Sequence, residues 1–256
     1  MVIASAVNEE GEELFPRKWN SEFIELPIVD GESQHKPTFT TEEINLMLKT
    51  TDDARLQVHI VLLAASGMRV DEALGLDINN VSEDGKTITI CEKAYQGEVQ
   101  DFLKTKNGER VVDLSPEVGS LLREYIDKRK KGLVFATRTG QPLSQSNLLK
   151  RSLHPLLEDS KIPVCGFHAF RRYRATHLRK QRTPEALTQF WLGHTGKSIT
   201  DSYDRSRDDE VYRKEVAKSV GTGFAVPAVL AVPSVRNVRE NREEWEAEKL
   251  EIACTA

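Results

Sequence analysis

The sequence predicts a mainly α-helical domain that contains a small antiparallel β-sheet, an α+β fold. Two observations lead to this prediction. Helix-start signals followed by apolar stretches recur along the chain, and between them the dipeptides Asp84-Gly85 and Asn107-Gly108 favour tight hairpin turns. With 256 residues, of which 39% are apolar, the chain can bury an ordinary hydrophobic core. We therefore expect a few strands inserted among packed helices.

The first part of the predicted domain, which begins near Pro37, combines two helices with these strands. Thr40 and Glu43 have the spacing of a capping box, so a helix should start there. A second helix should cover the apolar stretch 56–65. The segment KTITI after Asp84-Gly85 is typical of a strand, and DFLKTK and RVVDL should pair across Asn107-Gly108.

The second part of the domain is predicted to be mostly helical. Ser115-Pro116-Glu117 supplies a cap and a proline at the first helical position, and this helix should run to Gly132. The segment LVFAT that follows is expected to be a short strand. From Ser144 to about Lys218 the chain should be helical, with another helix start at Thr183-Pro184-Glu185.

The two ends of the chain are predicted to lie outside this domain. Residues 1–36 lack helical or alternating periodicity and indicate a tail and linker. After Gly221 the chain is rich in Gly, Pro and Ala and then reads REEWEAEKLEIA, which is typical of a tether followed by a short amphipathic helix. A frayed terminus is the alternative for residues 221–256.

Charge is distributed unevenly along the chain, although the net charge is only -4. Residues 1–100 carry 8 basic and 19 acidic side chains, whereas residues 101–182 carry 18 basic and 8 acidic ones. A middle third this basic indicates a surface that binds a polyanion such as nucleic acid. A solvated surface of mixed charge is the alternative.

Several classes of protein are not favoured by the sequence. It has no run of about 18 apolar residues and no basic segment before an apolar stretch at its start, so we expect neither membrane insertion nor secretion. The three cysteines are far apart and lack metal-ligand spacing. Because neither GxxxxGK[ST] nor GxGxxG occurs, we expect no nucleotide cofactor.

Five short segments occur in a fixed order: ASGMRVDEALGL, LKTKNGERVVDL, HAFRRYRATHL, LGHTGKSI and DSYDR. Over roughly residues 37–215 this pattern resembles the catalytic domain of the tyrosine recombinase, or phage integrase, family. The resemblance implies that family's fold and a site in which an Arg, a hairpin Lys, a His-x-x-Arg pair, a second His and a Tyr converge on one DNA phosphate. The matching positions are Arg69, Lys104, His168, Arg171, His194 and Tyr203.

Competing positions exist for the lysine and for the nucleophile. Lys106 flanks the same turn as Lys104, although the spacing from Lys104 to Arg110 fits the family better. Tyr212 is the other tyrosine of this region, but Tyr203 keeps the family's interval of nine residues from the second histidine. Arg172 stands where many family members have His, which leaves the role of that position open.

The residue types also suit phosphate chemistry by themselves. His168 and Arg171, at i and i+3, share one face of a helix, and the planar fork of an arginine can donate two hydrogen bonds to phosphate oxygens. The alternatives are an ordinary basic helix face for these two residues and a surface ion pair of Arg69 with Asp71 or Glu72.

The resemblance implies site-specific recombination of double-stranded DNA through a 3′-phosphotyrosyl intermediate, without metal, ATP or another cofactor. A type IB topoisomerase-like enzyme and a non-catalytic DNA-binding protein with the same fold are the alternatives. The expected partners are double-stranded DNA and further protomers, with a monomer in free solution and a tetramer on DNA. We expect no membrane association and a location in the cytoplasm, with the nucleoid.

The same resemblance divides the chain into three parts. Residues 1–36 would be the end of a helical core-binding domain and its linker, with most of that domain missing from this chain. Residues 37–220 would form the catalytic domain. Residues 221–256 would be a tether and a short helix that can dock on a neighbouring protomer.

Overall fold

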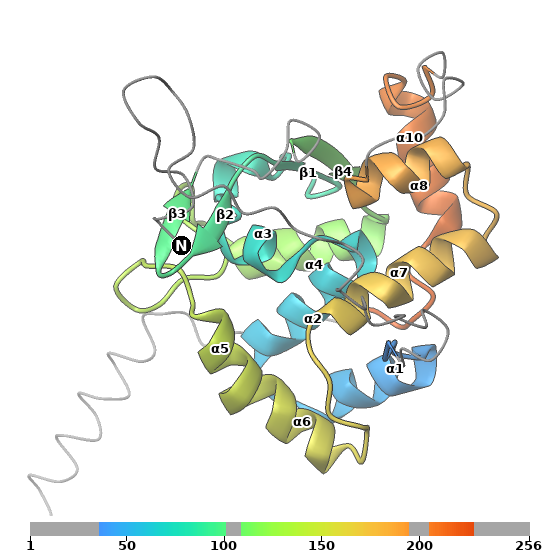
Figure 1. The fold of residues 1–256 in the computed structure, drawn as a ribbon. Helices are drawn as coiled ribbons and strands as arrows, with labels where there is room; N and C mark the ends of the chain where they lie inside the picture. The colour runs from blue at the N-terminus through green and yellow to red at the C-terminus, as the bar shows by residue number, and fades with distance from the viewer. Residues whose placement is uncertain (1–35, 101–108, 195–204, 228–256) are drawn as a thin grey trace, which may run out of the picture. The chain divides into compact units, whose positions relative to one another are not determined.

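The computed structural model describes residues 36–100, 109–194 and 205–227. The chain divides into two units at the junction between Lys36 and Pro37. Every helix and strand with defined bounds belongs to the second unit, Pro37–Ala256 (Figure 1).

The first two helices of this unit start at side-chain caps. Helix α1 spans Thr41–Thr50, and the Thr40 hydroxyl accepts from the Glu43 amide at 3.2 Å while the Glu43 carboxylate accepts from the Thr40 amide at 2.8 Å. Helix α2 spans Ala54–Ser66 and is capped by the side chain of Asp53. Both predicted helices, and the capping box, are confirmed.

Two antiparallel pairs of strands follow α3 (Val70–Leu74) and the short 3-10 helix η3 (Ile78–Asn80). Strand β1 (Thr87–Ile90) pairs with β4 (Arg110–Asp113), and β2 (Lys93–Tyr95) pairs with β3 (Glu98–Gln100). The predicted turn at Asp84-Gly85 precedes β1, and Asn107-Gly108 lies outside the described residues. The β2–β3 turn at Gln96-Gly97, where both residues have positive φ, was not predicted.

The middle of the domain differs from the sequence prediction in two places. Helix α4 spans Pro116–Ile126 and ends six residues before the predicted end at Gly132, because Asp127 takes a φ of 51° and leaves the helix. The predicted strand LVFAT is wrong, since Leu133 and Ala136 form only isolated β-bridges. Arg129 Nη1 donates to the carbonyls of Leu133 and Val134 at 3.2 Å each, so a side chain holds this segment.

The last part of the described chain is helical, as predicted. Helix α5 (Gln145–Leu148), the π-helical turn η5 (Leu149–Leu153) and α6 (His154–Asp159) follow one another directly. Helices α7 (His168–Lys180), α8 (Glu185–Leu192) and α10 (Glu210–Val220) come next. The start of α8 directly after Thr183-Pro184 confirms the third predicted helix start.

The core is organised around α2, which contacts both α4 and α7 (Figure 1). A helix that is apolar on every side is stable only when it is surrounded, and α2 is buried from Leu56 to Ser66. This position brings Gly67, the residue that ends α2, next to α7 and α8.

Residues 221–225, which the sequence analysis assigns to a tether, pack against the domain. The Tyr173 hydroxyl and Arg174 Nη1, both on α7, donate to the carbonyls of Thr222 and Gly221 at 3.0 and 2.7 Å. Phe224 is buried in the core. The folded unit therefore extends beyond α10, because the backbone after this helix finds its hydrogen-bond donors on α7.

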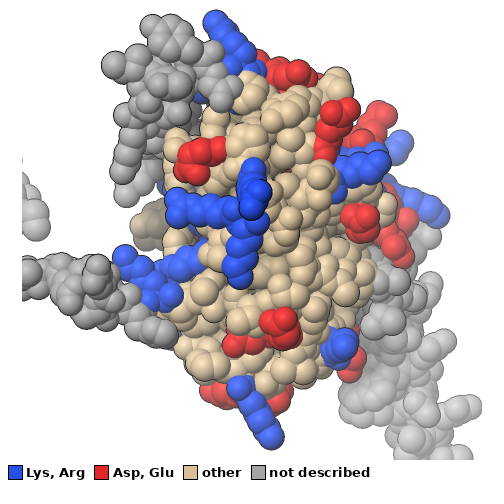
Figure 2. Space-filling model, turned by 90° about the vertical axis from the view of Figure 1, so that its right-hand side faces the viewer, with Lys and Arg blue, Asp and Glu red and all other residues tan. Residues whose placement is uncertain are grey.

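Basic and acidic side chains are interspersed on the face of the molecule that lies at the right of Figure 1, which Figure 2 shows from the front. Within the described ranges, every helix is too short or too polar to traverse a lipid bilayer.

Candidate active site

Arg69 stands at the N-terminal end of α3, two residues after the glycine that ends α2. Its backbone amide donates to Glu72 Oε2 at 2.8 Å, and its Nη1 donates to Glu72 Oε1 at 2.9 Å. The Arg69 side chain is 48% exposed, whereas that of Glu72 is 4% exposed. The ion pair that the sequence left open as an alternative therefore exists, and it orients a cation that remains accessible.

Glu72 also holds Arg110, the first residue of β4. Arg110 Nη2 donates to Oε2 at 2.8 Å and Nη1 donates to Oε1 at 3.1 Å, with the Arg110 side chain only 1% exposed. Burial raises the pKa of Glu72, but its hydrogen bonds and charge pairing with Arg110 and Arg69 outweigh burial and bring the pKa below its ordinary value. One ionised carboxylate thus fixes two arginines.

Arg171 lies one turn into α7 and is buried. Its Nη1 donates to the Gly67 carbonyl at 2.8 Å, and its Nη2 donates to the Leu192 carbonyl, so that it joins the end of α2 to the end of α8. Burial, followed by the positive charges of Arg69 and Arg110, lowers the Arg171 pKa to about 10. The guanidinium remains charged at neutral pH, and main-chain carbonyls help to hold it beside the other two arginines.

Two glycines permit this close approach. Gly67 has a φ of 68°, and a Cβ atom there would meet Leu192 Cδ2 at 2.7 Å. Gly193 has a φ of 66°, and a Cβ atom there would meet Arg110 Nη1 at 2.9 Å. Arg110 Nε donates to the Trp191 carbonyl at 2.9 Å. A side chain at either glycine would push the end of α8 away from the arginines.

His168 begins α7 and His194 follows the glycine that ends α8, and both are exposed. Partial burial lowers the pKa of each ring, and the charges of Arg171 and Arg69 lower it further in both cases. Arg171 and Arg69 are thus near enough to both rings to lower their pKa values, and Arg172 acts on His168 as well. Both imidazoles are neutral at pH 7, a state that can accept a proton or donate an N–H hydrogen bond.

Six charged or titratable residues, contributed by α3, β4, α7 and the end of α8, form a group that we call the cation cluster. Three arginines against one carboxylate leave an excess of positive charge, which suits an anion with several oxygen atoms such as a phosphate. Among the described residues, no group of three or more His, Cys, Asp or Glu side chains could hold a metal ion. The members of the cation cluster are Arg69, Glu72, Arg110, His168, Arg171 and His194.

The structure brings together four of the six residues that the sequence analysis singled out. These are Arg69, His168, Arg171 and His194. The other two, Lys104 and Tyr203, lie outside the described residues, as does the alternative lysine, Lys106. The alternative nucleophile Tyr212 is described on α10, where its side chain is partly exposed and its amide donates to the side chain of Asp209.

Sequence reasoning missed Glu72 and Arg110 as members of the cluster. The sequence suggested Glu72 only as a possible surface ion-pair partner of Arg69. It suggested Arg110 only as the residue whose spacing favours Lys104 over Lys106. The three-residue interval from Arg69 to Glu72 at a helix start was a local signal for their pairing. No local signal pointed from Glu72 to Arg110, which is 38 residues away.

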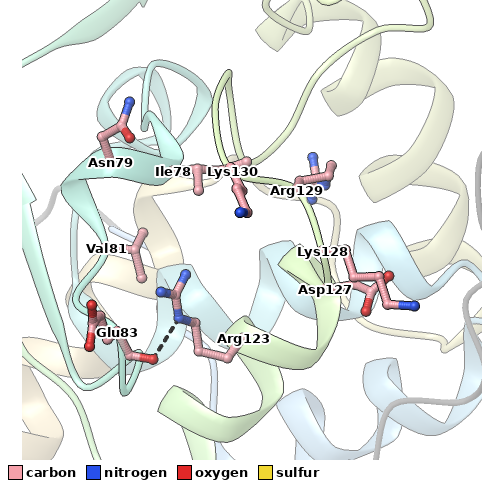
Figure 3. A pocket seen from close by; sticks show the side chains of 9 residues that line it. All are labelled: Ile78, Asn79, Val81, Glu83, Arg123, Asp127, Lys128, Arg129 and Lys130. Carbon is pink, nitrogen blue, oxygen red and sulfur yellow. Dashed lines mark hydrogen bonds between the residues drawn. The ribbon is translucent and has the colours of Figure 1, made fainter.

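A pocket of about 570 Å³ shares no residue with the cation cluster (Figure 3). Arg123 Nε donates to the Glu83 carbonyl at 2.9 Å across it, and Arg129 is bonded to main-chain carbonyls. Four basic and two acidic side chains line the pocket, and both of its arginines are bonded to main-chain carbonyls. Its lining comprises Ile78, Asn79, Val81, Glu83, Arg123, Asp127, Lys128, Arg129 and Lys130.

The chain belongs to the phage integrase family, whose model matches residues 37–210. This range contains the whole cation cluster as well as Lys104 and Tyr203. The family that the sequence pattern predicts is therefore confirmed.

Individual relatives are tyrosine recombinases. A XerC-like tyrosine recombinase of Caldanaerobacter subterraneus subsp. tengcongensis is 28% identical over 190 residues, which are 64% of this chain and 48% of the relative. XerD of Haemophilus influenzae is 25% identical over 197 residues, which are 73% of this chain and 61% of the relative. The chain therefore spans between about half and three fifths of the length of these relatives.

Solved structures of low identity share the fold. The integrase from mycobacterium phage Brujita superposes with a TM-score of 0.55 at 17% identity, covering 75% of this chain and 60% of that one. XerA recombinase gives a TM-score of 0.52 at 20% identity, covering 72% and 65%. The Tn1549 transposon integrase in complex with a circular intermediate DNA gives 0.55 at 15% identity, covering 85% and 68%. The predicted fold class is confirmed.

Proposed function

We propose that this chain cleaves and rejoins double-stranded DNA as a site-specific tyrosine recombinase. The observation that carries the proposal is the cation cluster, in which the buried Glu72 carboxylate orients Arg69 and Arg110 while Arg171 and two neutral imidazoles lie near these arginines. Negative charge builds on the non-bridging oxygens of a phosphodiester when a nucleophile attacks it. Fixed cations stabilise this charge and so lower the activation barrier for cleavage. Membership of the phage integrase family and the DNA complexes of its structural relatives support the same reaction.

In the proposed reaction, Tyr203 Oη attacks the scissile phosphorus, and the bond from phosphorus to the 5′-oxygen breaks. His168 takes the phenol proton, and Lys104 gives a proton to the leaving 5′-oxygen. Arg69 and Arg171 bind the non-bridging oxygens, and His194 donates an N–H hydrogen bond to one of them. The products are a 3′-phosphotyrosyl link and a free 5′-hydroxyl; attack by a 5′-hydroxyl reverses these steps and rejoins the strand.

The pKa directions fit these roles. A histidine whose pKa lies below 6.5 is neutral at pH 7, so His168 can accept the phenol proton without first losing one. Arg171 keeps its charge throughout. The phosphotyrosyl bond retains the energy of the phosphodiester, which is why the reaction requires no ATP.

The first experiment replaces the proposed nucleophile. The full chain is incubated with a pool of nicked duplexes of random sequence, and adducts that survive denaturation are isolated and sequenced. The wild type should yield adducts, and Tyr203→Phe should yield none while it still binds the selected duplex, because only the nucleophilic oxygen is lost. Tyr212→Phe is the matched control and should behave as wild type. Adducts from Tyr203→Phe, or none from wild type, would contradict the proposal.

The second experiment tests the general acid. Lys104→Ala should cleave the selected duplex about 10²- to 10⁴-fold more slowly. Sulfur in place of the bridging 5′-oxygen leaves as a thiolate and needs no proton, so this substrate should restore most of the rate to Lys104→Ala. It should not rescue Arg69→Ala, whose charge serves the non-bridging oxygens. If Lys106→Ala is rescued instead, the assignment is wrong by two residues.

Double-stranded DNA and other copies of this chain are the proposed partners. We infer a monomer in free solution and a tetramer in a DNA synapse, with residues 240–252 docking on a neighbouring protomer, because a tethered amphipathic segment this short gains stability only from a partner. The location would be the cytoplasm, at the nucleoid. Mass photometry with and without the selected duplex, for the full chain and for a chain lacking 240–252, tests this assembly; unchanged assembly after the deletion would contradict the docking.

A further inference from the structure

Asp113, the last residue of β4, joins three elements through one oxygen atom. Its side chain is 0% exposed. Asp113 Oδ2 accepts from Trp191 Nε1 of α8 at 3.0 Å and from Arg213 Nε of α10 at 2.9 Å. The same three elements lie together at the upper right of Figure 1, and both helices contact β4. We call Asp113, Trp191 and Arg213 the Asp113 network.

Burial makes the partners of Asp113 indispensable. An ionised carboxylate away from water is costly unless it is paired, and a buried indole N–H also requires an acceptor. Arg213 is itself largely buried, and its guanidinium lies over the Phe190 ring of α8, 5.6 Å from the ring centre. Removal of one partner would leave the other charge buried and unpaired.

The Asp113 network continues directly into the cation cluster through the last turn of α8. The carbonyl of Trp191 accepts from Arg110 Nε, and the carbonyl of the next residue, Leu192, accepts from Arg171 Nη2. His194 follows two residues later. The indole ring of Trp191 is thus anchored to Asp113 while the backbone of the same turn orients two arginines.

We propose that Asp113 is a positioning residue for DNA cleavage: by holding the Trp191 indole and Arg213, it fixes the last turn of α8, and through that turn the places of Arg110, Arg171 and His194. The proposal rests on the proposed recombinase function for its kinetic consequence and on the hydrogen bonds alone for its geometric consequence. Asp113 itself does not contact the DNA in this role.

The kinetic test uses two variants in single-turnover adduct formation on the selected nicked duplex. Asp113→Asn keeps the size of the side chain but removes the charge opposite Arg213, and Trp191→Phe removes the indole N–H and leaves a smaller aromatic ring. A misplacement of about 1 Å in an active site can cost about 10²-fold in rate. We expect the rate constant to fall about 10- to 100-fold in Asp113→Asn and about 3- to 10-fold in Trp191→Phe, with the Kd for the duplex nearly unchanged.

Gln57→Met is the matched control for a loss of stability. Gln57 is buried on α2 and donates to the carbonyls of Leu48 and Thr51 at 3.1 and 2.6 Å, outside both the network and the cluster. A variant that is only destabilised forms fewer adducts because less protein is folded, but the folded fraction reacts at the wild-type rate constant. Gln57→Met should lower only the total amount of adduct formed. If Asp113→Asn also lowers only that amount and leaves the rate constant unchanged, the positioning role is wrong.

The geometric test follows the His194 ring by NMR in the free protein, with His194→Gln to assign its signal. Partial burial and the charges of Arg171, Arg69 and Arg110 hold the His194 pKa below its ordinary value, and Glu185 opposes them. Loss of the Asp113 charge alone would lower this pKa further, whereas displacement of the α8 turn away from the arginines would raise it.

A rise of the His194 pKa toward 6.5 in Asp113→Asn supports the positioning role, and an unchanged or lower value overturns it. The two failures are distinguishable. If the wild type forms no adduct on any duplex, the recombinase function fails, and the titration of His194 still decides whether Asp113 positions the α8 turn.

Discussion

The two ends of α7 carry the same pair of side chains in different surroundings. At the N-terminal end, His168 is exposed and Arg171 joins the end of α2 to the end of α8. At the C-terminal end, Arg174 and His177 are both buried, and they donate to the carbonyls of Gly221 and Val220 at 2.7 and 3.1 Å. Both pairs are spaced by three residues on one helix.

The comparison shows that the neighbours of an arginine decide its role more than its own burial does. Burial is the largest influence on Arg171 and on Arg174, and each has a pKa lowered to about 10. The second influence differs, because Arg171 is repelled by Arg69 and Arg110, whereas the neighbour of Arg174 is Tyr173. Arginines held close together despite their mutual repulsion indicate that the N-terminal end of α7 binds an anionic ligand. A buried arginine that donates to a main-chain carbonyl, as Arg174 does, indicates a structural role at the other end.

The largest expected effect separates the two arginines by cleavage rate. Arg171→Lys loses the planar fork that the proposed reaction places beside the phosphate, so the rate constant for adduct formation should fall about 10²- to 10³-fold. Arg174→Lys should leave the rate constant of the folded fraction within about threefold of wild type. Single-turnover kinetics on the selected duplex measures both. Equal rate defects in the two variants would remove the distinction between the ends of α7.

A smaller effect is expected on stability. In Arg174→Met the Gly221 carbonyl loses its donor, and the free energy of unfolding should fall by about 1–3 kcal/mol. Arg172→Met is the matched control on the same helix: Arg172 donates to the Pro37 carbonyl at 2.7 Å but is only partly buried, so its loss should cost less. Urea titrations compare them. A larger loss in Arg172→Met would refute the fastening role of Arg174.

The smallest expected effect concerns pH. Burial lowers the pKa of His177 in the folded protein below 6.5. Between the folded and unfolded pKa values the unfolded chain binds more protons, so stability rises with pH and is lost as pH falls below about 6.5. His177→Gln should weaken this dependence of the unfolding free energy. His59, which is fully buried and has a pKa of about 3, adds to the pH dependence of stability in the same direction. Its contribution is equal in the wild type and in His177→Gln, so it cancels when the two are compared.

The matched measurement at the other end of α7 is the pH dependence of cleavage. In the proposed reaction a neutral His168 accepts the phenol proton, so the rate should fall as acid protonates this ring below pH 6.5. His177→Gln should keep this acid limb and His168→Gln should lose it. An acid limb that instead follows His177 would place the proton acceptor at the wrong end of the helix.

Features set by neighbouring residues were predictable. The Thr40 capping box depends on contacts within four residues and occurs as the sequence predicts, and a helix starts directly after Thr183-Pro184, also as predicted. The sequence predicts a strand over LVFAT, residues 133–137, because buried apolar residues look alike in a strand and in a loop that a side chain holds by hydrogen bonds. The carbonyls of Leu133 and Val134 accept hydrogen bonds from Arg129, which can reach them because α4 ends at Ile126.

The sequence by itself determined the family and four members of the cation cluster, because the order and spacing of short motifs can be read from the sequence without knowledge of the fold. Only the tertiary structure showed that Glu72 pairs with Arg110, 38 residues away, and that Asp113 holds Trp191 and Arg213, 78 and 100 residues away. These partners are buried charges and polar groups, and such groups are stable only where packing brings their counterparts together. That packing is a property of the whole chain, so no local pattern of residues records it.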